Sequence, residues 1–170
     1  IVEKIEAPEI LFIPDKNLGT FVKNAFPEKN IVVWDGYCPI HDRVTAEDIL
    51  EAKKAHPEAL VAVHPECKKE VVDLCDMAGS TADIIKFSLN SDKDVIIGTE
   101  RGVADYLTLK YPEKGFYHLA PEKLVCKDMK YVDTDTLLKA LRGEAGEVIE
   151  IDEALRIKAK KSIDEMLRLG

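Results

Sequence analysis

Two stretches of this chain decide its fold. Residues 10–30 read ILFIPDKNLGTFVKNAFPEKN, and residues 95–115 read VIIGTERGVADYLTLKYPEKG. They align without a gap at an offset of 85 residues, so that Asp15-Lys16 corresponds to Glu100-Arg101. Each begins with an apolar run and ends with an aromatic residue followed by Pro-Glu-Lys. Self-similarity at one fixed offset indicates that a supersecondary unit is repeated.

The rest of the chain alternates short β-branched runs with longer segments of helical pattern. This alternation is typical of an α/β fold, in which crossover helices connect the strands of a parallel sheet. Five runs are predicted to be buried strands: Ile10–Ile13, Ile31–Trp34, Leu60–Val63, Val95–Ile97 and Phe116–Leu119.

Two helices have clear boundary signals. Thr45 and Asp48 have the spacing of a capping box, which predicts a helix from Thr45 to about His56, before Pro57. From Asp152 onward, apolar residues recur at helical spacing among charged ones up to Gly170, which predicts an amphipathic closing helix.

Composition narrows the range of partners. The 170 residues include 24 Lys and Arg against 32 Asp and Glu, for a formal charge of −8, and 46% are apolar. No apolar run approaches the length of a membrane span, and no basic block offers a face for nucleic acid. No signal peptide begins the chain, so a cytoplasmic protein without a membrane or nucleic-acid partner is expected. Small molecules or proteins are the expected partners.

The four cysteines are interpreted by position. No Cys-x-x-Cys pair occurs, but Cys38 corresponds to Cys126 if the second repeat carries a three-residue insertion. Loops that leave the carboxyl ends of parallel strands are where open α/β sheets bind ligands. The two thiolates could therefore share a metal or cluster. The alternative is that both repeats inherited a small buried residue there. Cys67 and Cys75 have no repeat partner and are read as structural thiols.

An ordered set of motifs resembles the quinolinate synthase family over nearly the whole chain. The motifs are Asp15-Lys-Asn-Leu-Gly19, Gly36-Tyr-Cys-Pro-Ile-His41, His64-Pro-Glu-Cys67, Gly79-Ser-Thr81, Gly98-Thr-Glu100 and Cys126-Lys-Asp-Met-Lys130. The resemblance implies a fold of internally repeated three-layer αβα units with short parallel sheets, incomplete in this chain. It covers only the C-terminal half of such an enzyme, or somewhat more.

The resemblance also implies a reaction and a cofactor. Enzymes of this family condense iminoaspartate with dihydroxyacetone phosphate to form quinolinate in NAD biosynthesis, and an aspartate-oxidising enzyme supplies the first substrate. A [4Fe–4S] cluster with one open iron acts as a Lewis acid. By motif, Cys38 and Cys126 match its second and third cysteine ligands, and the first would lie upstream of Ile1. His41 is a candidate neighbour of the cluster.

Five further residues are expected at the substrate site by resemblance. His64 and Glu66 are the catalytic candidates and also line the substrate cavity, with Glu66 as general acid or base and His64 as a proton shuttle. Ser80 and Thr81, at an expected helix N-terminus, would bind carboxylates, and Lys86 would be a further anion partner. The competing interpretations are a plain strand-to-helix turn at His64–Glu66 and ordinary helix capping at Ser80 and Thr81.

The domain prediction follows from the repeat. Residues 1–37 are the second half of one αβα unit, 38–125 a complete unit, and 126–170 a cysteine loop with helices that pack on an absent N-terminal unit. Such a fragment is expected to be inactive alone, within a monomer or a homodimer. One alternative is an anion-binding α/β module without a metal. A zinc hydrolase is weaker, because the sequence shows no His-Glu-x-x-His motif or three-ligand cluster.

Overall fold

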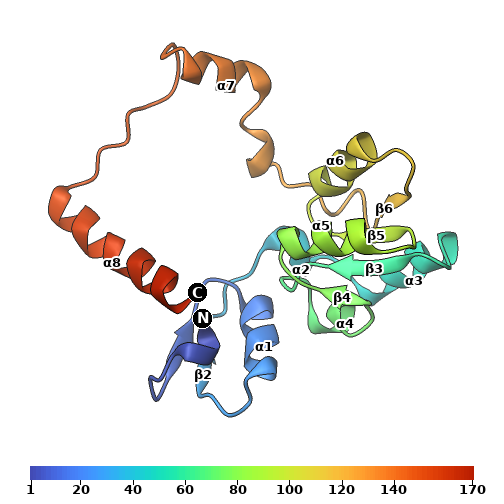
Figure 1. Ribbon diagram of the computed structural model, residues 1–170, viewed down its shortest axis with the longest axis horizontal. Helices are drawn as coiled ribbons and strands as arrows, with labels where there is room; N and C mark the ends of the chain where they lie inside the picture. The colour runs from blue at the N-terminus through green and yellow to red at the C-terminus, as the bar shows by residue number, and fades with distance from the viewer. The chain divides into compact units, whose positions relative to one another are not determined.

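The computed structural model describes all 170 residues and divides them into two compact units. The larger unit comprises Glu9–Cys126, and the smaller combines Ile1–Pro8 with Lys127–Gly170 (Figure 1). The larger one contains every strand and every candidate site residue, and its strands and helices alternate as an α/β fold requires.

The main sheet of the larger unit has four parallel strands in the order β4-β3-β5-β6. Three of them match predicted strands: β3 (Leu60–Val63), β5 (Val95–Gly98) and β6 (Phe116–His118). The fourth, β4 (Met77–Ala78), was not predicted. Its two residues lack the β-branched signal of a strand, and pairing with Ala62 and Val63 of β3 forms it instead.

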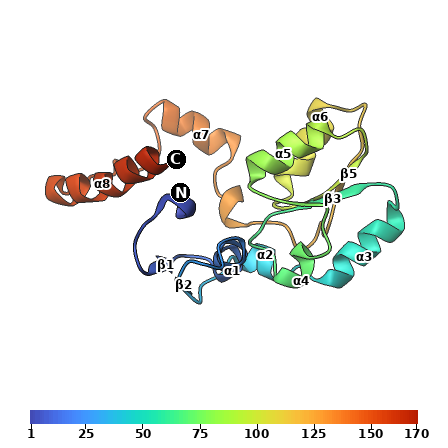
Figure 2. The ribbon, with the colours of Figure 1, turned by 60° about the horizontal axis from the view of Figure 1, so that its bottom comes forward.

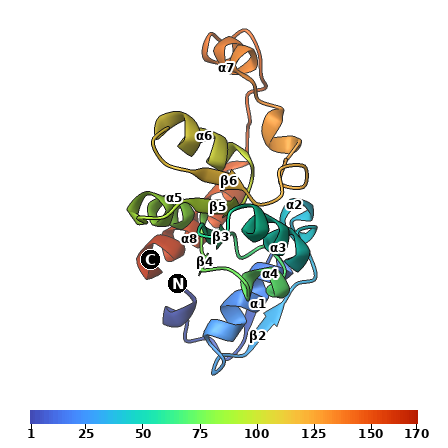
Figure 3. The same cartoon turned by 90° about the vertical axis from the view of Figure 1, so that its right-hand side faces the viewer.

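Helices cover both faces of this sheet, which makes a three-layer αβα unit. Helices α5 (Thr81–Asn90) and α6 (Gly102–Lys110) lie on one face, and α3 (Ala46–Ala55) and α4 (Lys69–Val72) lie on the other (Figures 2 and 3). Side chains of each strand alternate between the two cores. On β3, Val61 and Val63 join the α3–α4 core, and Ala62 joins the α5–α6 core.

The repeat found in the sequence is a repeated βαβ unit. Strand β1 (Ile10–Phe12), helix α1 (Lys16–Ala25) and strand β2 (Ile31–Val33) form a parallel pair with a crossover, as β5, α6 and β6 do. Ile10 pairs with Ile31 and Val95 pairs with Phe116, so partners are 21 residues apart in both copies. The predicted repeat is confirmed down to its strand register.

One feature of the strand prediction was wrong. The run Ile10–Ile13 and the run Ile31–Trp34 are buried on one face only, because α1 packs there and nothing in this unit covers the other face. Leu11 is 63% exposed and Trp34 is 60% exposed, while Ile31 is fully buried. An apolar run identifies a strand but does not reveal which of its faces has a neighbour.

Helix starts follow the predicted capping chemistry. The Thr45 backbone N–H donates to Asp48 Oδ2 at 2.8 Å, which completes the expected capping box of α3. Short α2 (Pro39–Asp42) begins directly after Cys38.

The smaller unit is helical. It contains the 3-10 turns η1 (Val2–Lys4) and η2 (Asp128–Lys130), with α7 (Thr134–Leu141) and α8 (Glu153–Leu169). Asp152 caps α8 and Gly170 ends it, as predicted, but its apolar residues stay exposed within this unit, Leu155 at 58% and Ile163 at 54%. Neither α8 nor any other helix combines the length and the apolar character needed to cross a bilayer.

Candidate functional site

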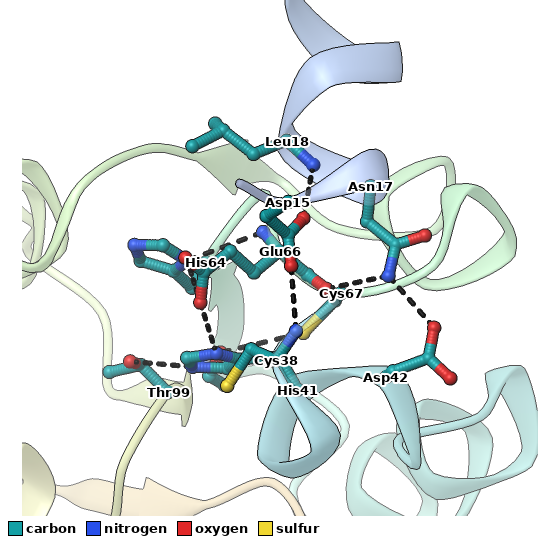
Figure 4. A network of polar contacts seen from close by, with 11 residues as sticks. Asp15, Asn17, Leu18, Cys38, His41, Asp42, His64, Glu66, Cys67 and Thr99 are labelled. Carbon is teal, nitrogen blue, oxygen red and sulfur yellow. Dashed lines mark hydrogen bonds and ion pairs between the residues drawn. The ribbon is translucent and has the colours of Figure 1, made fainter. Parts of the chain in front are cut away.

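The candidate residues gather where the strands of the larger unit end. Asp15 follows β1, Cys38 follows β2, His64 and Glu66 follow β3, and Thr99 follows β5 (Figure 4). The carboxyl ends of the strands within one parallel sheet lie at one edge, and contacts such as Asn17 Nδ2 to the Glu66 carbonyl at 3.0 Å join the edge of the β1–β2 sheet to that of the main sheet.

Glu66 is held by a buried histidine. The His41 Nδ1 atom lies 2.8 Å from Oε2 of Glu66, and its Nε2 lies 3.1 Å from the Thr99 hydroxyl. A carboxylate only accepts, so Nδ1 of His41 carries the proton of this bond. The Cys38 thiol also interacts with this carboxylate, and the Glu66 side chain is 25% exposed. Glu66 is therefore oriented but still reachable.

His64 stacks on His41 and is neutral. The two ring centroids lie 4.7 Å apart with planes inclined by 18°. The backbone N–H of Glu66 donates to His64 Nδ1 at 3.2 Å, which places the ring proton on Nε2. Burial lowers the pKa of His64 below its ordinary 6.5, and the neighbouring His41 lowers it further. His64 thus presents a neutral imidazole beside the Glu66 carboxylate.

Cys38 lies beside the same carboxylate. Its Sγ, a ring nitrogen of His41 and a carboxylate oxygen of Glu66 all lie within 4.8 Å of one another. The sequence shows no local three-ligand cluster, because Glu66 lies 25 residues after His41. The folded chain nevertheless brings the three residues together, so the expectation that no such cluster exists was wrong. Burial raises the pKa of the Cys38 thiol, and the Glu66 charge raises it further. A cation bound at this point would oppose that shift and favour the thiolate form of Cys38.

Cys126 occupies the equivalent place in the second repeat. It is half-buried, and its backbone N–H donates to Glu100 Oε1 at 3.4 Å. It does not belong to the Cys38–His41–Glu66 group.

Asn17 connects three of these segments. Its Nδ2 donates to Asp42 Oδ1 at 2.8 Å and to the Glu66 carbonyl at 3.0 Å. One amide from α1 thereby ties α2, which follows Cys38, to the loop that carries Glu66.

The predicted carboxylate-binding residues lie at the start of α5. Ser80 is its N-cap, and its hydroxyl already donates to Asp83 Oδ2 at 2.6 Å in a capping box. Thr81 is exposed, and its hydroxyl makes no hydrogen bond within the chain. Lys86 lies further along the helix and lines a hollow with Met77 and Phe87 that does not include His64 or Glu66.

The other two cysteines have different surroundings. Cys67 is 1% exposed within the α3–α4 core, and burial raises its pKa to about 12. Cys75 is half-buried, with Sγ 3.1 Å from the Val72 carbonyl. All four cysteines are free thiols.

Sequence reasoning missed Thr99 and gave Asp15, Asn17 and Glu100 no role of their own. The repeat alignment pairs Asp15 with Glu100, and that pairing was the available signal. Thr99 and Asn17 stood inside the motifs Gly98-Thr-Glu100 and Asp15-Lys-Asn-Leu-Gly19, but no pattern within the motifs predicted their contacts with His41 and Glu66.

Comparisons with known proteins identify the family of this chain. The family model described as quinolinate synthetase A protein matches residues 1–168. The chain is 44% identical over 170 residues to a quinolinate synthase of Thermodesulfovibrio yellowstonii, with 99% of this chain and 55% of that protein covered. It is 45% identical over 171 residues to those of Clostridioides difficile and Caldicellulosiruptor saccharolyticus, with 100% of this chain and 56% of each relative covered. The chain spans about half the length of the curated relatives it matches. It belongs to the quinolinate synthase family.

Proposed function

We propose that this chain forms part of a quinolinate synthase that makes quinolinate from iminoaspartate and dihydroxyacetone phosphate. Family membership supports the reaction class. The observation that carries the assignment to particular residues is the meeting of Cys38, His41 and Glu66 within 4.8 Å, beside the neutral ring of His64. A bare anion-binding module would need neither a thiol nor a buried histidine at this point.

Cys38 and Cys126 are the residues that would hold a [4Fe–4S] cluster. Both are half-buried thiols at equivalent points of two repeats, and cluster iron takes thiolate ligands. A bound cation would lower the raised pKa of Cys38 and favour the thiolate that iron binds. When bound, an open-site cluster supplies Lewis acidity toward a substrate hydroxyl or carboxylate. Two thiols are fewer than the usual three or four, so another ligand has to come from outside this chain.

Glu66 is the proposed general base and acid. Enolisation and water loss both require a group that removes a proton from carbon and returns one to oxygen. The hydrogen bond from His41 orients the Glu66 carboxylate, and its 25% exposure leaves it accessible to a substrate proton. His64, neutral and carrying its proton on Nε2, can donate a hydrogen bond from that atom to a substrate oxygen.

Ser80 and Thr81 are the proposed partners of substrate or product carboxylates. The N-terminus of α5 offers backbone amides and the free Thr81 hydroxyl, which suits an anion. Lys86 adds a positive charge on the same helix, within the electrostatic reach of Asp83. In a chain of net charge −8, such local positive potential is needed to hold a dianion.

The test uses the complete protein prepared without oxygen. Iron, acid-labile sulfide and quinolinate formation are measured for wild type, Cys38→Ser, Cys126→Ser and Cys75→Ser. About four irons and four sulfides are expected in wild type, a loss of cluster and activity in the first two variants, and wild-type content in the third. Cys75 is a matched control, because it is a half-buried thiol outside the site. Unchanged iron in Cys38→Ser and Cys126→Ser would contradict the ligand assignment.

A zinc enzyme is the second candidate, and the Cys38–His41–Glu66 group favours it. Three ligands of these types with one open position are typical of catalytic zinc. Metal analysis of the same preparation separates the two. One zinc per chain, lost in His41→Ala and retained in Cys126→Ser, would replace the cluster with a zinc site.

A further inference from the structure

Asp15 holds a helix and a cysteine at the same time. This carboxylate is only 3% exposed. Its Oδ1 accepts the backbone N–H of Leu18 at 2.8 Å, which caps α1, and its Oδ2 accepts the backbone N–H of Cys38 at 2.7 Å. Figure 4 shows the side chain placed between the start of the helix and the cysteine. A helix cap needs only the first of these bonds.

Glu100 does the same in the second repeat. It is 7% exposed, its Oε2 accepts the backbone N–H of Gly102 at 2.8 Å at the start of α6, and its Oε1 accepts the backbone N–H of Cys126 at 3.4 Å. The sequence alignment places Glu100 on Asp15. Two different acids thus make the same two kinds of bond at equivalent positions.

The backbone around each pair also matches. The N–H of Lys16 donates to the Gly36 carbonyl at 2.7 Å, and the N–H of Arg101 donates to the Leu124 carbonyl at 2.8 Å. Gly36 and Leu124 each lie two residues before the cysteine of their repeat. Each cysteine loop is therefore attached at two points: the carboxylate accepts the cysteine N–H, and the N–H of the next residue donates to the carbonyl two residues before the cysteine.

We propose that Asp15 and Glu100 are the positioning residues of the two cysteine loops, Asp15 for Cys38 and Glu100 for Cys126. Asp15 fixes the backbone of Cys38 through a short, charge-assisted hydrogen bond of 2.7 Å, and Glu100 holds that of Cys126 through a longer and weaker one of 3.4 Å. Only one part of this role rests on the proposed function, namely that the positioned thiols bind a cluster. The attachment of the loops is a property of the chain itself.

The two carboxylates also bring negative charge next to both proposed ligands. Negative charge beside a bound cluster would oppose its reduction, so the pair would keep the potential low. This suits a cluster that acts without redox change. The two hydrogen bonds of Asp15 go to the backbone N–H groups of Leu18 and Cys38.

The amide variants Asp15→Asn and Glu100→Gln test the proposal. An amide has one acceptor oxygen and one donor nitrogen, so it can accept from only one of the two N–H groups. Asp94→Asn is the matched control. Asp94 is a half-buried carboxylate that accepts the Gly115 N–H at 3.0 Å and the Tyr117 hydroxyl at 2.9 Å, and it precedes β5 at the opposite edge of the sheet.

The first readout is alkylation of each cysteine by iodoacetamide in the cluster-free complete protein, followed by peptide mass spectrometry. Asp15→Asn is expected to speed labelling of Cys38 about fivefold, as expected for roughly 1 kcal/mol of lost hydrogen bonding, and to leave Cys126 unchanged. Glu100→Gln is expected to give the reverse pattern. Asp94→Asn is expected to change neither rate.

The second readout is the holoprotein. Both variants, and not Asp94→Asn, are expected to lose iron faster to a chelator and to show a higher midpoint potential of the cluster, since a negative charge has been removed. Equal labelling changes at both cysteines, or none, would overturn the positioning role and leave two helix caps. A wild-type protein that contains no iron would contradict the proposed function. The positioning role would still be decided by labelling, since it requires Asp15→Asn to affect Cys38 alone and Glu100→Gln to affect Cys126 alone.

Discussion

The His41 ring and the Glu66 carboxylate share a hydrogen bond of 2.8 Å, although 25 residues separate them in the chain. His41 comes from α2 and Glu66 from the loop after β3. The bond fixes one oxygen of the carboxylate and, with Cys38 beside it, defines the centre of the candidate site.

Replacing Glu66 by Gln is expected to lower kcat by about 10²- to 10⁴-fold, the usual contribution of a general acid–base group. The amide still accepts the His41 proton but can no longer take one from substrate. Iron content should stay at the wild-type level, since Glu66 is not a proposed ligand. The control is Glu70→Gln, an exposed residue of α4, for which kcat should not change. A Glu66→Gln variant with wild-type kcat would remove Glu66 from the chemistry.

The lowered pKa of His64 predicts a pH dependence of stability. Unfolding restores an ordinary pKa near 6.5, so the unfolded chain binds the proton more readily than the folded one. The contribution of His64 to stability is therefore complete above pH 6.5 and declines as the pH falls through and below that value. The free energy of unfolding can be measured by urea titration between about pH 5 and 8, the range in which histidine ordinarily titrates. As the pH falls, this free energy should decrease less steeply in His64→Gln than in wild type. Identical slopes in the two proteins would contradict a neutral, buried His64.

Variants at the start of α5 can distinguish helix capping from substrate binding. Asp83→Asn and Ser80→Ala both weaken the capping box and should each cost about 1 kcal/mol of stability. Thr81→Val removes a hydroxyl without a partner in the chain and should leave the free energy of unfolding nearly unchanged. If Thr81 binds a substrate carboxylate, only its variant combines wild-type stability with a KM raised several-fold. An unchanged KM would leave ordinary capping as the whole role of this turn.

Much of the fold could be read from the sequence, because repetition and periodicity are local signals. The offset of 85 residues predicted a second βαβ unit, and the strand register repeats it. Strand β4 could not be predicted, because Met77 and Ala78 become a strand only through pairing with β3. The open face of β1 was equally hidden, since burial depends on neighbours that the run itself does not encode.

The site was predictable only in parts. The order of motifs drew attention to Cys38, His64 and Glu66, but no local pattern places His41 and Thr99 against them. Asp15 and Glu100 look like simple helix caps in the sequence, because a cap and a two-point attachment require the same residue types. The distinction depends on the second bond, to the cysteine N–H, which only the folded chain makes.

Gly19 is expected to be essential for the packing of α1 on β2. A Cβ built there would lie 2.6 Å from Cγ1 of Val33 and 2.9 Å from the Phe12 ring, far inside normal contact. Gly19→Ala should therefore destabilise the protein by about 1–3 kcal/mol despite the higher helix propensity of alanine. Val33→Ala should recover part of this loss when combined with it, measured by urea unfolding of the four members of a double-mutant cycle. Additive effects would show that the two side chains do not compete for the same space.

Cys67 is expected to be the least reactive of the four thiols, although its motif places it next to Glu66. Burial raises its pKa to about 12, so at pH 8 only about one molecule in 10⁴ carries the thiolate that reacts with iodoacetamide. Its side chain also lies in the α3–α4 core and is 1% exposed. In the folded, cluster-free protein, Cys67 should stay unlabelled while Cys38 and Cys126 are modified, and all four should react in 6–8 M urea, a range chosen to exceed ordinary unfolding midpoints. Rapid labelling of Cys67 in the folded protein would mean that the core under the site opens readily, and the rigid placement of Glu66 argued above would then fail with it.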